Sequence, residues 1–243
     1  MNFNIITLFP EMFPGINGLA LSGKALEKNI WSYKTINLRD FAINDYGSVD
    51  DSPFGGGAGM VIRPDVMADA IDSIPRETRG RIIYFSPRGK PLTQKMAREL
   101  SREQNLTLVC GRYEGLDQRA IDEYEMEEVS VGDYILSGGD LAAQILIDTC
   151  TRLLDNVVGK TESINEESFE IGLLEYPLFT RPAAWRGRDV PEVLLNGNHK
   201  NIADWRREQA QKITMERRPD LMSESAKAKS SANDKKETND EHH

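Results

Sequence analysis

Three short stretches of the chain place glycines where α/β proteins commonly bind a ligand. They are SPRGKPL at 86–92, CGRYEGLD at 110–117 and VGDYILSGGD at 131–140. Each follows an apolar run typical of a buried strand, and open α/β sheets bind ligands at the carboxyl ends of their strands. Glycine also lets the backbone approach a ligand closely. Together the loops predict one pocket whose backbone N–H and C=O groups bind a flat heterocycle, although each loop alone could be structural.

The third stretch has the turn-forming residues of a loop, yet it carries side chains that proteins usually bury, namely Val131, Tyr134, Ile135 and Leu136. A buried loop needs partners for its backbone polar groups, because an unpaired N–H or C=O away from water is costly. A bound ligand would supply such partners. We therefore expect loop 131–136 to be buried as one wall of the pocket.

A fourth glycine-rich stretch, DDSPFGGGAGM at 50–60, fits neither of the two common phosphate-binding patterns. The GK[ST] of a P-loop is missing, and Met60 stands where the dinucleotide-binding fingerprint needs its last glycine. The stretch is either a loop whose backbone approaches a flat ligand or a structural hairpin.

The elements that must position these loops alternate along the chain. Short apolar runs predict strands at 3–9, 32–38, 81–86, 106–110 and 127–131. Longer patterns predict helices at 18–29, 64–73, 91–104, 117–124 and 139–155, with Pro91 in the first turn of the third. This alternation predicts an α/β fold with a mainly parallel sheet.

The composition of the 243-residue chain is that of a globular protein, with 39% hydrophobic and 28% charged residues. Its apolar runs are far too short for a membrane span, and its first residues lack the features of a secretion signal. Cys110 and Cys150 form no motif and there are only three His, which argues against a zinc site or a disulfide framework. We expect a cytoplasmic protein with no metal centre defined by spacing.

The net charge of −9 is unevenly distributed along the chain. Residues 181–218 carry 9 Lys and Arg against 5 Asp and Glu, a balance of +4, whereas residues 1–180 carry 17 against 28, a balance of −11. A basic segment on an acidic body suits nucleic acid binding, although a charged helical surface explains it equally well. Residues 221–243 are polar and lack aromatic side chains, which predicts a disordered tail.

Seven motifs occur in order between the first residues and about residue 220. They are LFPEMF, VDDSPFGGGAGM, SPRG, VCGRYEGLDQR, VGDYILSGGD, ESFEIGLLEYPLFTRP and VPEVLLNGNHKNIADWR. Together they make the chain resemble the bacterial tRNA (guanine-N1)-methyltransferase family. The resemblance implies a SPOUT-type α/β core with a C-terminal trefoil knot, which ordinary topology rules would not predict. It also implies an obligate homodimer with active sites at the subunit interface.

The resemblance further implies a division of the chain and an activity. Residues 1–160 would form the S-adenosylmethionine-binding core, 161–180 an interdomain linker or lid, and 181–220 a small helical tRNA-binding domain. The family transfers a methyl group from S-adenosyl-L-methionine to N1 of the guanosine at tRNA position 37, 3′-adjacent to the anticodon, which supports reading-frame maintenance. The implied partner is the tRNA anticodon stem-loop, rather than DNA or a membrane, and Mg²⁺ is a possible cofactor.

The cofactor-binding residues that the resemblance implies lie in the three loops. They are Tyr84, Ser86, Pro87, Gly89, Gly111, Glu114, Val131, Gly132, Asp133, Tyr134, Ile135, Leu136, Gly138 and Gly139. The glycines at 111, 132, 138 and 139 would leave space for the ligand. For Gly138 and Gly139 a second interpretation stays open, in which the turns of the knot themselves require glycine.

Methylation at guanine N1 needs a base that accepts the N1 proton and a cation that holds charge on O6. The family's arginine falls on Arg152, which would otherwise be interpreted as a surface ion pair with Asp148, four residues earlier. The family's base falls on Glu167, where Asp is the commoner residue, with Glu166 as a second carboxylate beside it. Without the resemblance, these acidic residues predict only a solvated loop.

The resemblance also implies two sets of tRNA-binding residues. The target nucleotide or its phosphates would contact Asp50, Gly55, Gly57, Gly59 and Ser163. The backbone of the anticodon stem would contact Arg181, Arg186, His199, Lys200, Arg206 and Arg207. We expect Trp185 and Trp205 in the core. Two alternatives are a knotted methyltransferase that modifies the ribose 2′-oxygen or another base, and an RNA-binding protein without catalysis.

Overall fold

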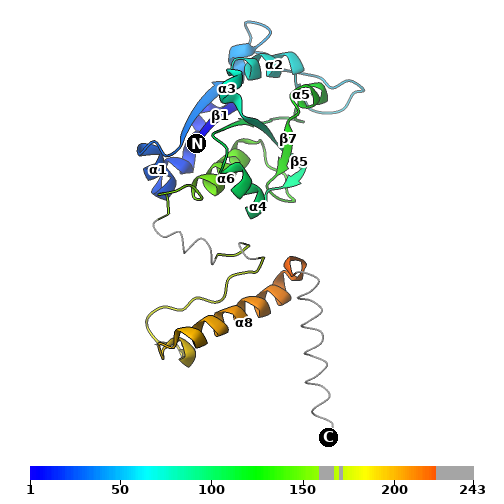
Figure 1. The fold of residues 1–243 in the computed structure, drawn as a ribbon. Helices are drawn as coiled ribbons and strands as arrows, with labels where there is room; N and C mark the ends of the chain where they lie inside the picture. The colour runs from blue at the N-terminus through cyan, green and yellow to red at the C-terminus, as the bar shows by residue number, and fades with distance from the viewer. Residues whose placement is uncertain (159–166, 170–171, 223–243) are drawn as a thin grey trace. The chain divides into compact units, whose positions relative to one another are not determined.

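The structure is a computed structural model that describes residues 1–158, 167–169 and 172–222 (Figure 1). The chain divides into two compact units, residues 1–159 and residues 160–243. None of the described helices is long and apolar enough to cross a membrane.

The first unit is built on a five-stranded sheet in which every pair of neighbouring strands is parallel. Its strands are β1 (Asn2–Thr7), β2 (Ser32–Asn37), β5 (Arg81–Pro91), β6 (Asn105–Val109) and β7 (Glu127–Ser130), in the spatial order β2-β1-β6-β5-β7. This confirms the predicted α/β fold with a mainly parallel sheet. Because β6, β5 and β7 are neighbours, the loops that follow them meet at one edge of the sheet.

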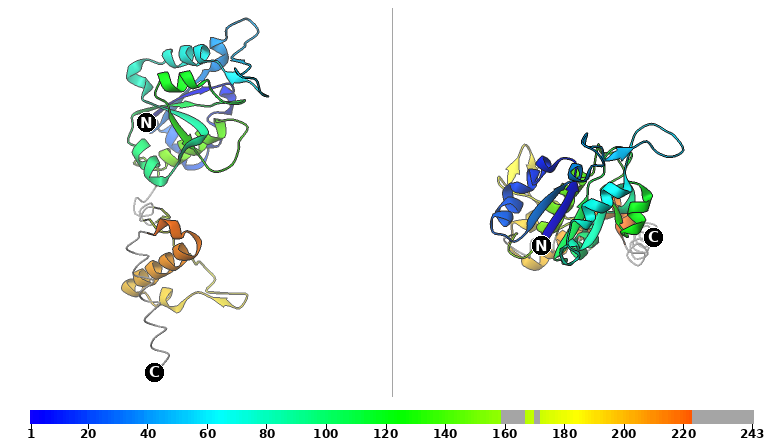
Figure 2. Two further views of the ribbon diagram at one scale, coloured as in Figure 1. Left: turned by 90° about the vertical axis from the view of Figure 1, so that its right-hand side faces the viewer. Right: turned by 90° about the horizontal axis from the view of Figure 1, so that it is seen from above.

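Helices cover both faces of this sheet (Figures 1 and 2). One layer contains α1 (Ala20–Glu27), α4 (Gln94–Leu100) and α6 (Asp140–Thr151), and the other contains α2 (Pro64–Asp72), α3 (Arg76–Arg79) and α5 (Gln118–Glu123). Successive side chains of a strand point to opposite faces. Phe3 and Ile5 accordingly pack in one apolar cluster with α1, α4 and α6, whereas Ile6 packs in a second cluster with α2 and α5.

The prediction of a helix at 91–104 is wrong at its start. β5 continues through Pro91 and shifts its register on β7 between Phe85 and Lys90, so residues 86–89 bulge out of the ladder. The helix begins only after Thr93, whose hydroxyl caps it by accepting a hydrogen bond from the Met96 N–H at 3.2 Å. The bulge is what turns the 86–89 segment into a loop beside the end of the sheet.

The 50–60 stretch forms the structural hairpin that was one of its two interpretations. β3 (Asp50–Asp51) pairs antiparallel with β4 (Val61–Ile62), and the glycines at 55, 56, 57 and 59 all have positive φ. A Cβ at Gly59 would overlap the side chain of Glu114, so the hairpin touches the loop after β6. Whether its backbone also contacts a ligand stays a prediction.

The described residues of the second unit form the long helix α8 (His199–Arg217), together with β8 (Ala184–Trp185), β9 (Arg188–Asp189), η4 (Glu192–Leu194) and η5 (Pro219–Leu221). Asn198 caps α8, because its side chain accepts from the Asn201 N–H at 3.3 Å. An extended segment lies along the helix, where the Leu174 N–H donates to Thr214 Oγ1 at 2.8 Å. The described part of the expected 161–180 linker therefore packs within the same unit as α8.

Two expectations for this unit need correction. Trp185 is not a core residue, because it is 57% exposed on a short hairpin that reaches into solvent. Trp205 is half-buried and packs against Phe179, with ring centroids 6.2 Å apart. The start of the predicted tail at 221 is also too early, since Met222 is buried. Residues 223–243 lie outside the described residues, and their predicted disorder stays a prediction.

Candidate functional site

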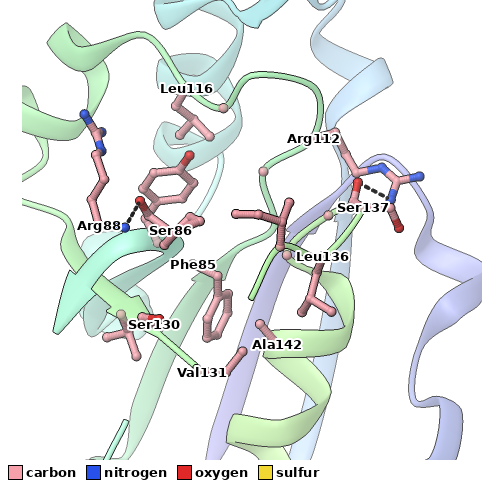
Figure 3. Close-up of a pocket in the computed structure, with 18 of the residues that line it drawn as sticks. Phe85, Ser86, Arg88, Arg112, Leu116, Ser130, Val131, Leu136, Ser137 and Ala142 are labelled. Atoms are coloured by element: carbon pink, nitrogen blue, oxygen red, sulfur yellow. Dashed lines mark hydrogen bonds between the residues drawn. The ribbon is translucent and has the colours of Figure 1, made fainter. Parts of the chain in front are cut away.

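A pocket of about 520 Å³ lies where the loops after β5, β6 and β7 converge (Figure 3). Its walls come from residues 84–88, 111–116, 118, 129–132 and 134–139, together with Ala142 of α6. This volume lies within the range of small-molecule sites. The three stretches that the sequence singled out therefore do form one pocket.

Most of the residues predicted to bind the cofactor line this pocket. They are Tyr84, Ser86, Pro87, Gly111, Glu114, Val131, Gly132, Tyr134, Ile135, Leu136, Gly138 and Gly139. Asp133 is not among the lining residues, and neither is Gly89. A Cβ at Gly89 would overlap the backbone of Glu128 and Val129. Glycine is required there by the close approach of β5 to β7, not by a ligand.

The sequence interpretation also missed several lining residues. They are Phe85, Arg88, Arg112, Tyr113, Gly115, Leu116, Gln118, Val129, Ser130, Ser137 and Ala142. Seven of these eleven are direct neighbours of residues that were assigned, so taking every residue of a converging loop would have found them. The other four, Leu116, Gln118, Val129 and Ala142, depend on how the ends of the strands and the start of α6 pack around the pocket.

The expected burial of loop 131–136 is wrong for two of its side chains. Tyr134 is 54% exposed and Ile135 is 81% exposed, whereas Val131 and Leu136 pack against the apolar cluster beside α6. The loop supplies hydrogen-bond partners for some of its own backbone groups, because the Tyr134 N–H donates to the Gly132 carbonyl at 3.0 Å. The Tyr134 hydroxyl donates to the Val131 carbonyl at 3.1 Å. The loop therefore lines the pocket with both of its ends packed on the core, while the side chains in its middle are exposed.

Two glycines of the site are explained by packing of the loops on one another. A Cβ at Gly139 would lie 2.9 Å from Cα of Cys110, because the start of α6 crosses the backbone after β6. The Gly139 N–H donates to the Gly111 carbonyl at 2.9 Å across this contact. A Cβ at Gly111 would lie 2.9 Å from the Tyr84 ring. The structural interpretation therefore holds for Gly139, and Gly111 makes room for Tyr84.

Burial sets the ionisation of two groups near the pocket. It raises the pKa of the Tyr84 phenol, so this hydroxyl stays neutral at physiological pH. Burial, with a smaller contribution from Asp140, raises the pKa of the Cys110 thiol well above its usual range. A buried thiol held in this protonated form is a poor nucleophile.

Two arginines are among the charged residues that line the pocket. Arg88 donates from Nη2 to Gln118 Oε1 and to Glu128 Oε2, each at 3.3 Å. Arg112 donates from Nη1 to the Ser137 carbonyl at 2.9 Å (Figure 3). The interior is mainly backbone and apolar side chains, which suits a flat heterocycle bound through its edge.

The predicted catalytic residues do not line the pocket of the first unit. Arg152 is half-buried and ends α6 as its C-cap, its N–H donating to the Asp148 carbonyl at 3.1 Å. Glu167 belongs to the second unit. Ser163 and Glu166 lie outside the described residues. The roles of these residues stay predictions.

The predicted tRNA-binding residues lie in two places. Asp50, Gly55, Gly57 and Gly59 belong to the β3–β4 hairpin, while Arg181, Arg186, His199, Lys200 and Arg207 are exposed on the second unit. Arg206 differs from the other cations, because it is half-buried and its guanidinium lies 4.8 Å from the centroid of the Tyr176 ring. Within the part of the chain that the structure describes, no group of three His, Cys, Asp or Glu residues could hold a metal ion.

Comparison with known proteins agrees with the motifs. The family model described as tRNA (Guanine-1)-methyltransferase TrmD matches residues 1–224. A tRNA (guanine-N(1)-)-methyltransferase of Rhodospirillum rubrum is 56% identical over 228 residues, covering 93% of this chain and 95% of the relative. A protein of the same name from Wolbachia pipientis wMel is 53% identical over 225 residues, covering 91% and 95%. The chain belongs to the TrmD family of tRNA (guanine-N1)-methyltransferases.

Proposed function

We propose that this chain transfers the methyl group of S-adenosyl-L-methionine to N1 of the guanosine at position 37 of tRNA, in the cytoplasm, and so supports reading-frame maintenance. The observation that carries the proposal is the pocket of about 520 Å³ formed by the three family motifs. Its size and its lining of backbone and apolar groups fit an adenine ring and its ribose.

The pocket would bind the methyl donor mainly through the shape of its walls. Backbone groups of the loops at 84–88 and 131–138 would pair with the adenine edge, and apolar side chains such as Leu116 and Leu136 would cover its faces. The donor supplies an electrophilic methyl group on a positively charged sulfur. The chain's own task is therefore to align that methyl with guanine N1 and to exclude water.

The guanine must lose its N1 proton before the lone pair can attack. We assign this proton to the carboxylate of Glu167, and the charge that grows on O6 to the guanidinium of Arg152. Glu167 replaces the Asp that is commoner in the family, so its longer side chain must be set back to reach the same atom. Ser163 would contact the same nucleotide.

The tRNA would lie on the cations of the second unit and on the β3–β4 hairpin. Arg181, Arg186, His199, Lys200 and Arg207 are exposed and can reach phosphates. Arg206, which is half-buried and stacks on Tyr176, would add a further cation to this surface. We assign residues 181–220 to tRNA binding and residues 1–160 to the methyl donor. The proposal assigns no residue to Mg²⁺.

Two further family features belong to the proposal, namely a homodimer with interfacial active sites and a trefoil knot. Apolar side chains are exposed on three elements that contact one another, namely α1, α6 and η2 (Gly15–Gly18), the turn before α1. The Asn17 amide of η2 donates to the Gln144 carbonyl of α6 at 3.1 Å. The exposed side chains are Ile16, Leu19, Leu21, Leu141 and Ile145. A surface of this kind fits a second copy of the chain. The crossing of Gly139 over Gly111 fits a knot.

The experiment is methylation of an unmodified tRNA transcript by the full chain with S-adenosylmethionine, followed by nucleoside analysis. We expect 1-methylguanosine from a transcript with guanosine at position 37 and none from one with adenosine there. A ribose-methylated or differently methylated product would favour the other knotted methyltransferases. Binding of the transcript without any methylated product would favour an RNA-binding protein and overturn the proposal.

A further inference from the structure

Arg112 lines the pocket, and the proposed function gives it no role. It follows Gly111 in the loop after β6, and its side chain reaches the far end of the loop after β7 (Figure 3). There Nη1 donates to the Ser137 carbonyl at 2.9 Å. The guanidinium carbon lies 4.5 Å from the centroid of the Phe9 ring, within the range of a cation–π contact. One side chain thus connects three segments.

Asp140 supplies the charge that matches this guanidinium. It is only 1% exposed, and Oδ2 lies 3.9 Å from Arg112 Nη1. Oδ1 accepts a hydrogen bond from the Thr7 hydroxyl, whereas Oδ2 is buried with no hydrogen-bond partner among the described residues. A buried carboxylate with one unbonded oxygen depends on nearby positive charge. The amino end of α6 provides part of it, and Arg112 provides the rest.

The aliphatic part of the Arg112 side chain is also closely packed. A Cβ at Gly138 would overlap Arg112 Cδ, so the glycine leaves the space through which the side chain passes. Arg112 is therefore fixed between the Phe9 ring and the backbone of Gly138, with a side chain that is 24% exposed. The residue at position 138 is therefore glycine because a side chain there would collide with Arg112, and not because a ligand needs the space.

We propose that Arg112 is a positioning residue that latches the 131–137 wall of the pocket in the shape that binds the methyl donor. The middle of this wall is exposed at Tyr134 and Ile135, and the hydrogen bonds given above for these residues lie within the loop itself. The bond to the Ser137 carbonyl ties its far end to the loop after β6. Without it, the loop must be ordered by the ligand, and that ordering weakens binding. This inference rests on the proposed function for the identity of the ligand.

The test is calorimetric titration of the full-length chain with S-adenosylhomocysteine. Arg112→Met keeps the apolar stem and removes the charge and the donors, so we expect affinity to fall by about tenfold or more. Arg79→Met is the matched control. Arg79 likewise pairs with a carboxylate, Asp72 at 3.1 Å, and lies over an aromatic ring, that of Tyr124, but it does not line the pocket. The control should lose thermal stability and keep the wild-type affinity.

A second variant distinguishes an effect of Arg112 on the shape of the pocket from an effect on the stability of the fold. Arg112→Met combined with Asp140→Asn removes the unpaired buried charge, so we expect it to regain thermal stability and to stay weak in binding. Hydrogen exchange in the free protein should be faster over residues 131–137 in both Arg112 variants than in Arg79→Met. Wild-type affinity in either Arg112 variant would overturn the latch. Failure of the wild-type chain itself to bind S-adenosylhomocysteine would instead overturn the proposed function.

Discussion

The pocket of the first unit and the surface of the second unit are built in opposite ways. The pocket lies between two apolar clusters, and glycines let its loops cross one another closely. In the second unit the buried side chains among the described residues are few, namely Ala210, Thr214 and Met222, while its cations face solvent. A rigid site of backbone groups recognises a ligand by shape, whereas exposed cations recognise charge. The two parts should therefore respond differently to mutation and to salt.

The largest effect should come from removing the proposed base. Glu167→Gln keeps the size and the hydrogen-bonding reach of the side chain but removes its basicity, so methyl transfer should fall by about 10²-fold or more. Single-turnover methylation of one tRNA measures this without product release. Glu167→Asp should keep substantial activity because the carboxylate remains. Full activity in Glu167→Gln, or a loss confined to Glu166→Gln, would assign the proton to another group.

Arg152→Ala should have the next largest effect, of about 10²-fold on turnover, as expected for the loss of a group that stabilises developing charge. Binding of S-adenosylhomocysteine should stay nearly unchanged, because Arg152 does not line the pocket. Calorimetry and single-turnover rates on the same preparation separate the two quantities. If cofactor affinity collapses together with the rate, Arg152 supports the fold of α6 and has no direct role in the reaction.

The pocket could be predicted from the sequence because its signal is local. Glycines after apolar runs indicate the loops, and a parallel sheet brings the ends of neighbouring strands together. The extension of β5 through Pro91 could not be predicted in this way, because it depends on pairing with β7 beyond a bulge. Arg112 was missed for a related reason. Where a long side chain ends depends on segments far away in sequence, here Phe9 and Ser137.

The surface of the second unit was predicted less well, because exposure is not a local property. Trp185 was expected in the core since tryptophan is usually well buried. It lies instead on the β8–β9 hairpin, whose tight turn is made by Arg186 and Gly187, both with positive φ, and there it is exposed. The basic composition of residues 181–218 correctly indicated exposed cations, but it did not distinguish Arg206, which stacks on Tyr176.

Salt should weaken the binding of tRNA to the second unit more than the binding of the methyl donor to the pocket. Charge reversal at Lys200 and Arg207 should weaken tRNA binding by about tenfold and flatten its dependence on salt, because fewer counterions are released. Arg206 is left intact because its stack on Tyr176 makes it part of the fold. Reversal of Lys34 and Lys95, exposed lysines of the first unit, changes the net charge equally and serves as the control. Equal effects of the two pairs would place the tRNA surface elsewhere.

A smaller effect, of about fivefold, is expected for Trp185→Ala if a base of the tRNA stacks on the exposed indole. Arg186 already lies over this ring, with its guanidinium carbon 4.9 Å from the ring centroid. Trp31 is buried, so quenching of tryptophan fluorescence by tRNA should come mostly from Trp185. Quenching that persists in Trp185→Phe would assign the signal to Trp205 and remove Trp185 from the interface.

The smallest effect concerns the end of the chain and tests where the second unit stops. Met222 is buried, and its N–H donates to the Pro219 carbonyl at 3.3 Å. A chain cut after Met222 should keep the proposed dimerisation, methyl transfer and its melting temperature, because the residues removed are mostly polar and all but two of them lie beyond the family match. A cut after Asp220 also removes Leu221 and Met222, which should cost the second unit about 1–3 kcal/mol of stability. The two truncated chains compared by thermal unfolding and by tRNA affinity locate the boundary. Loss of activity in the longer chain would show that the tail takes part in function, and identical melting of the two would show that Met222 contributes nothing to the fold.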